Sequence, residues 1–138
     1  METSDKLAIY ELLSRAAYGL DEHNLDIIES CFAPEASMKV RIAGQDDLGP
    51  FEGREAIMKL MADSIAAQTD RRRHLISNIF FDVEDDAAAT VISNLTLIAT
   101  ENDASRLITT GGYRDKVIKV GGEWLIADRD ISLDLPFG

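Results

Sequence analysis

Residues 107–135 read LITTGGYRDKVIKVGGEWLIADRDISLDL, and this stretch decides the fold class. Two runs rich in β-branched and aromatic residues, Leu107–Val120 and Trp124–Leu135, are separated by Gly121-Gly122. A pair of glycines between two such runs is typical of a tight β-hairpin. The stretch therefore predicts two adjacent antiparallel strands.

Three further strands are predicted upstream of this hairpin. His74–Val83 is rich in β-branched and aromatic residues, and Asp85-Asp86 turns it into the long strand Ala89–Thr100. The polar residues 101–103 then turn the chain toward the hairpin, which predicts an antiparallel meander. In the first half of the chain, residues 37–43 (SMKVRIA) also have the composition of a strand.

Three helices are predicted in the first half of the chain. The first is capped by Thr3 or Ser4 and carries apolar residues at helical spacing: Ile9, Leu13, Ala16 and Leu20. The second covers Leu25–Phe32, and Pro34 either ends it or lies just past its end. The third covers Arg54–Ala67 after a loop over residues 44–53. Helices followed by a meander predict one α+β domain, residues 1–138, with the helices packed on one face of a curved sheet.

Composition narrows the class of partner. The chain has 138 residues and a formal net charge of −11, a field that repels nucleic acids and anionic membranes. No apolar run approaches the roughly 18 residues of a membrane span, and the N-terminus lacks the pattern of a signal peptide. One cysteine, Cys31, allows neither an internal disulfide nor a multi-cysteine zinc site. We therefore expect a cytoplasmic domain.

One charged residue stands where an apolar one belongs. Strand alternation places Arg129 on the same face as Ala127 and Ile131. A guanidinium group that faces a core is costly unless it is paired or lines a wet cavity. Both a structural ion pair and a ligand-binding role are consistent with this position.

Other polar residues have a structural and a functional interpretation. His74 follows the run Arg71–Arg73; isolated histidines are more often structural than catalytic, and such arginine runs are usually solvated. Asp21 ends the first helix, where an acid opposes the helix dipole, so it is either a surface acid or a functional one. Tyr18 and Tyr113 can donate hydroxyl groups to a pocket or belong to the core or its rim.

No motif for a metal or cofactor is present in the sequence. The two histidines, His23 and His74, are not spaced as metal ligands, and the chain has no glycine-rich phosphate loop. We therefore expect neither a metal nor a cofactor.

Four blocks of the chain resemble the SnoaL-like family: residues 18–36 (YGLDEHNLDIIESCFAPEA), 51–57 (FEGREAI), 71–78 (RRRHLISN) and 121–134 (GGEWLIADRDISLD). The resemblance implies the cone-shaped α+β fold of the nuclear-transport-factor-like superfamily, with three helices packed on the concave face of the sheet. Within that superfamily the pattern is nearest to scytalone dehydratase and hexachlorocyclohexane dehydrochlorinase, which use a His–Asp dyad inside the cone.

The resemblance assigns roles to particular residues. Asp21 and His74 stand at the positions of the dyad, and Arg129 stands at the position of an arginine of the dehydrochlorinase. Three positions depart from those enzymes: Ala16 replaces a lysine of the dehydrochlorinase, whereas Val40 and Asn94 replace a tyrosine and a histidine of scytalone dehydratase. The resemblance therefore implies a base but leaves the leaving group open.

The implied function is that of a lyase or isomerase that needs no cofactor. His74 would abstract a carbon-bound proton, Asp21 would orient it, and the substrate would be a small hydrophobic or aromatic compound held by four residues: Arg129, Tyr113, Asn94 and Tyr18. The fold also serves non-catalytic β subunits of ring-hydroxylating dioxygenases, so a ligand-binding or structural role is the alternative. Apolar residues on both faces of Ala89–Thr100 predict a homodimer or homotrimer.

Overall fold

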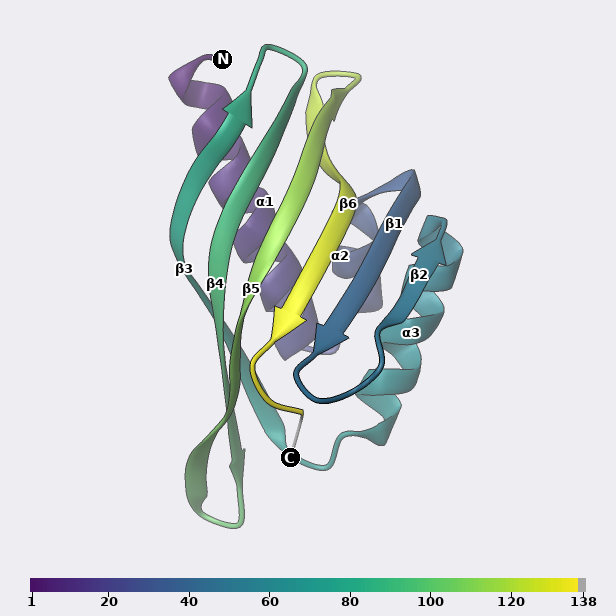
Figure 1. Ribbon diagram of the computed structural model, residues 1–138, viewed down its shortest axis with the longest axis vertical. Coiled ribbons are helices and arrows are strands. Elements are labelled where there is room, and N and C mark those ends of the chain that lie inside the picture. Colours follow the sequence, from purple (N-terminus) through teal and green to yellow (C-terminus); the bar gives the residue numbers. More distant parts are fainter. Residues whose placement is uncertain (137–138) are drawn as a thin grey trace.

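A computed structural model describes residues 1–136 and shows a curved six-stranded sheet with three helices on one face (Figure 1). The elements follow in the order α1 (Thr3–Asp21), α2 (Leu25–Ser30), β1 (Phe32–Ile42), β2 (Leu48–Glu52), α3 (Arg54–Ala67), β3 (Arg71–Glu84), β4 (Ala88–Glu101), β5 (Ala104–Val120) and β6 (Glu123–Leu133). The predicted α+β class is confirmed, and so is the packing of the helices on a curved, unclosed sheet.

The sheet joins the two halves of the chain. Its strand order is β2-β1-β6-β5-β4-β3, and β3 to β6 form the predicted antiparallel meander. The last strand, β6, lies parallel to β1, so the C-terminal strand inserts beside the first one (Figure 1). Residues from both ends of the sequence therefore meet on the concave face.

The strand β2 corrects the prediction of a loop over residues 44–53. It pairs with β1 at the edge of the sheet and contains Gly49 and Pro50, which interrupt any strand pattern in the sequence. An edge strand tolerates proline because one side of it needs no backbone donor. Pairing with β1, rather than local propensity, makes this segment a strand.

The boundary between α2 and β1 also differs from the prediction. The helix ends at Ser30 instead of Phe32, and β1 begins at Phe32 instead of Ser37. The register of β1 against β6 shifts between Phe32 and Ser37, and Pro34 falls in that interval. The proline therefore interrupts strand pairing rather than ending a helix.

The hydrophobic core lies between the helices and the concave face of the sheet. Ile9 and Leu13 of α1, Ile57 of α3 and Ile126 of β6 are each at most 1% exposed. Along β4 the odd-numbered residues 89–99 are buried and their neighbours are more exposed. This alternation decides which residues of the strand can reach the interior.

Candidate functional site

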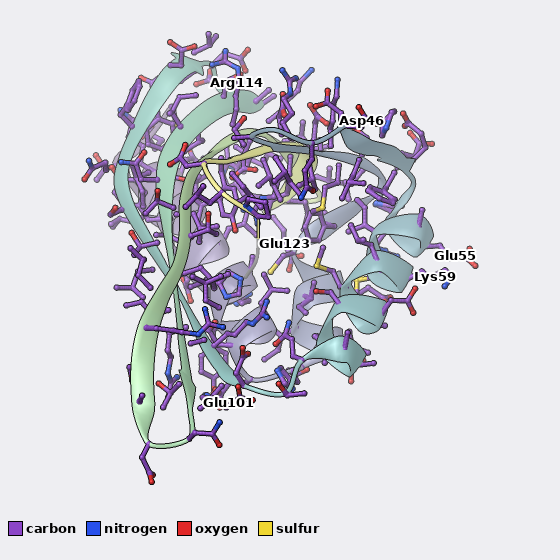
Figure 2. All side chains as sticks on the ribbon, turned by 60° about the horizontal axis from the view of Figure 1, so that its bottom comes forward. Asp46, Glu55, Lys59, Glu101, Arg114 and Glu123 are labelled. Atoms are coloured by element: carbon purple, nitrogen blue, oxygen red, sulfur yellow. The ribbon has the colours of Figure 1, made fainter. Side chains whose placement is uncertain are left out.

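A cavity of about 170 Å³ lies between α3 and the concave face of the sheet. Most of its wall is apolar, with side chains from α1, α3 and all six strands. Its polar residues are Ser64, Gln68, Arg72, His74 and Tyr113. Figure 2 looks along this space: the sheet curves around one side, and α3 closes the other with Glu55 and Lys59 on its outward surface.

Asp21 contacts His74, which lines this cavity. One carboxylate oxygen of Asp21, Oδ1, accepts a hydrogen bond from the backbone N–H of His74 at 2.9 Å and lies 2.7 Å from Nδ1 of its ring. The side chains of His74 and Asp21 are only 12% and 11% exposed. An ionised carboxylate only accepts hydrogen bonds, so this contact favours the tautomer of the ring with its proton on Nδ1 and a lone pair on Nε2.

The fold explains why the sequence tolerates an acid at the end of α1. Asp21 is the last residue of α1, where the dipole disfavours a negative charge. Its two hydrogen bonds to His74 tie this end of the helix to β3 and compensate for the unfavourable dipole. The contact joins residues that are 53 positions apart in the sequence.

Strand alternation divides the arginine run beside His74. Arg71 and Arg73 point outward, and both form ion pairs with Glu22. Arg72 faces the cavity, and its Nε donates to Asp70 Oδ1 at 2.8 Å. The expectation of a solvated run therefore describes Arg71 and Arg73 and is wrong for Arg72.

Arg129 faces inward as predicted but belongs to a buried ion pair. Its Nε and Nη2 donate to the two carboxylate oxygens of Asp115 at 2.7 and 3.0 Å, and the two side chains are 4% and 0% exposed. Burial opposes its charge, yet the Asp115 carboxylate keeps the pKa of Arg129 above its usual value. The ion pair matches the structural alternative; Arg129 does not line the cavity, and its role in substrate binding stays a prediction.

The two predicted tyrosines and Asn94 have different positions. Tyr113 is 5% exposed and lines the cavity; burial raises the pKa of its hydroxyl, which therefore stays protonated at neutral pH. Tyr18 is 56% exposed on α1, and Asn94 is exposed because β4 turns Ser93 and Leu95 inward. Neither lines the cavity, and their role in substrate binding stays a prediction.

Comparison with known proteins identifies the family. Residues 1–130 match the model of the SnoaL-like domain. The chain belongs to the SnoaL-like domain family. An uncharacterised protein of Mycobacterium tuberculosis (strain ATCC 25618 / H37Rv) is 23% identical over 129 residues, which are 93% of this chain and 84% of that protein.

Solved structures show the same fold around different activities. A protein of unknown function with a cystatin-like fold from Nostoc punctiforme matches with a TM-score of 0.83 and 23% identity, covering 99% of this chain and 97% of the other. Two chains from Novosphingobium aromaticivorans also match. A protein provisionally named a scytalone dehydratase has a TM-score of 0.77, 24% identity, and coverage of 96% and 85%. The beta subunit of a provisionally assigned aromatic-ring-hydroxylating dioxygenase has a TM-score of 0.82, 17% identity, and coverage of 98% and 94%.

Three polar residues of this SnoaL-like cavity were missed by the sequence reasoning: Ser64, Gln68 and Arg72. Arg72 has the same strand parity as His74, and Gln68 follows Ser64 by one helical turn. This spacing could have indicated from the sequence that each pair shares a face. Among residues 1–136, no three or more metal-ligating side chains form a group that could hold an ion. No helix in this range is long and apolar enough to cross a membrane.

Proposed function

We propose that this SnoaL-like chain is an enzyme that removes a proton from a substrate carbon, with His74 as the general base. This proposal rests on the 2.7 Å contact between Asp21 Oδ1 and His74 Nδ1. His74 also lines the cavity. Because Asp21 holds the proton on Nδ1, Nε2 is the nitrogen that accepts the substrate proton. The carboxylate then stabilises the imidazolium ion that forms.

The rest of the cavity supports a small hydrophobic or aromatic substrate. The apolar wall binds its body, and the protonated hydroxyl of Tyr113 can donate a hydrogen bond to an oxygen on which charge develops. The proton moves from carbon to Nε2, and the electron pair left on carbon moves to a carbonyl oxygen or expels a leaving group. This step begins both isomerisation and elimination, so the proposed class is a lyase or isomerase without a cofactor.

Hydrogen–deuterium exchange tests the base directly. A panel of small aromatic ketones is incubated with the protein in D₂O, and loss of the α-proton signals is followed by NMR. General-base catalysis is worth about 10²–10⁴ in rate, so we expect His74→Gln to lose that factor. Asp21→Asn removes the charge and should also slow exchange. His23→Asn, a change at the other, exposed histidine, should leave it unchanged.

Two results would contradict the proposal. One is exchange that persists at the wild-type rate in His74→Gln with unchanged circular dichroism. The other is saturable binding of these ketones without any exchange above the rate in buffer, which is the behaviour expected of a non-catalytic ligand-binding or structural subunit.

We also propose that the outer face of the sheet binds a second or third copy of the chain. Leu75 and Leu107 on this face are 45% and 60% exposed. Its charges are paired on the surface, as in Arg114–Asp82 and Arg41–Asp130, so the net charge of −11 is not concentrated there. Sedimentation at micromolar concentration should show a dimer or trimer that Leu75→Glu dissociates. A wild-type monomer would exclude the proposal.

A further inference from the structure

Four of the five polar residues of the cavity lie where α3 ends and β3 begins, and the fifth, Tyr113, lies on β5. Ser64 lies on α3, and Gln68 is the residue that caps its C-terminus. Arg72 and His74 are two positions apart on the same face of β3. The lining contributed by β1, β2, β4 and β6 is apolar. A ligand in the cavity therefore places its polar atoms toward the end that holds His74.

Gln68 presents an unused hydrogen-bond acceptor at this end. Its Oε1 is buried and accepts no hydrogen bond from any residue within 1–136. Buried polar atoms in folded proteins almost always have a hydrogen-bond partner. A ligand with an O–H group near the base would provide the missing donor.

Arg72 does not make this end of the cavity positive. Its guanidinium group is held by Asp70 at 2.8 Å, and the two side chains are 17% and 7% exposed. Asp70 balances its charge, and Asp21 adds a second carboxylate beside His74. The local charges therefore favour a neutral carbonyl oxygen over a carboxylate.

The size of the cavity limits the substrate further. A cavity of about 150 Å³ in another protein holds benzene. The space of about 170 Å³ in this chain accordingly accepts one ring with a short substituent. Resting on the assignment of His74 as the base, we propose that the substrate is a neutral hydroxy-carbonyl compound of single-ring size. Gln68 is then the residue that determines specificity, because it accepts the hydrogen bond of the hydroxyl group.

Three probes separate these features: 2-hydroxy-1-phenylethanone has the hydroxyl and the carbonyl group, acetophenone lacks the hydroxyl, and mandelate carries a carboxylate. Affinities are measured by NMR titration at pH 7. We expect the hydroxyketone to bind about 3- to 10-fold more tightly than acetophenone, the usual worth of one neutral hydrogen bond, and more tightly than mandelate. Gln68→Met, of similar length, should bring the ratio of hydroxyketone to acetophenone affinity to about one. Gln45→Met, at an exposed glutamine, should preserve it.

The affinity measurements test the role of Gln68, and the exchange reaction tests His74 as the base, so either proposal can be refuted without the other. Three outcomes would overturn the role of Gln68 and the substrate class. They are an unchanged ratio of hydroxyketone to acetophenone affinity in Gln68→Met, tighter binding of mandelate than of the hydroxyketone, and no binding of any probe. Measuring the ratio in His74→Gln as well keeps the two proposals apart. If the ratio depends on Gln68 while wild-type protein exchanges no α-protons, only the assignment of His74 as the base is refuted.

Discussion

Replacing Asp115 by asparagine should strongly destabilise the fold, because it leaves the charge of Arg129 buried without its partner. The pair is made by two parallel hydrogen bonds of 2.7 and 3.0 Å between groups that are 4% and 0% exposed. The guanidinium group also lies 4.2 Å from the centre of the Tyr113 ring, which covers another side of it. Asparagine has nearly the same shape, and the change therefore tests charge rather than packing.

The expected loss follows from this burial. Removing one partner of a buried ion pair costs about 3–5 kcal/mol of unfolding free energy. Unfolding entropy of about 2.1 cal/mol/K per residue gives roughly 0.3 kcal/mol/K for a chain of 138 residues. The melting temperature of Asp115→Asn should therefore fall by about 10–17 °C.

Urea unfolding followed by circular dichroism measures this loss, and the chain supplies its own control. Arg114 and Asp82 form a pair at 2.9 Å with side chains 55% and 44% exposed, so Asp82→Asn should cost no more than about 1 kcal/mol. The double change Arg129→Met with Asp115→Leu leaves no buried charge and should recover most of the lost stability. An Asp115→Asn protein as stable as Asp82→Asn would refute the reasoning, and so would a double variant less stable than the single one.

Two further predictions concern the backbone and acid stability. A Cβ atom at Gly111 would lie 2.2 Å from the carbonyl oxygen of Ser132, whereas at Gly112 the nearest atom is 3.5 Å away. Gly111→Ala should therefore melt far below Gly112→Ala, and equal melting temperatures would contradict the contact. Hydrogen bonds from Trp124, the Glu2 backbone and Lys119 lower the pKa of Asp5 from 3.8 to about 2. Because the folded pKa is the lower one, ionised Asp5 stabilises the fold above pH 3.8 and this stabilisation is lost as the pH falls toward 2. Urea unfolding at several pH values measures the free energy of unfolding. In this pH window it should depend less on pH in Asp5→Asn than in the wild type, and an equal dependence would exclude the stabilising role of ionised Asp5.

Elements that depend on local periodicity were predictable from the sequence, and those that depend on pairing were not. The helix Arg54–Ala67 and the meander from β3 to β6 were predicted from apolar spacing and glycine turns. The edge strand β2 was missed because only its pairing with β1 makes Gly49 and Pro50 part of a strand. For the site, residue patterns alone left His74 with a structural and a functional interpretation, and its contact with Asp21 was expected only from the family resemblance.

The partner of Arg129 was hidden by one extra residue in β6. Counted from the Gly121-Gly122 turn, regular pairing would place Arg129 opposite Arg114, a repulsive arrangement. The register shifts between Lys116 and Val117, which places Asp115 opposite Arg129 instead. The position of such a bulge cannot be read from the sequence. The bulge does, however, remove the repulsion between Arg129 and Arg114 that regular pairing would cause.

Strand parity predicts a face but not a position along that face. Arg129 and Arg72 both point to the concave side, yet Arg129 pairs with Asp115 and does not line the cavity, whereas Arg72 does. Arg72 is two residues from His74 on a single strand, a distance that no bulge in a neighbouring strand can change. The cation near the proposed base therefore belongs to β3 rather than β6.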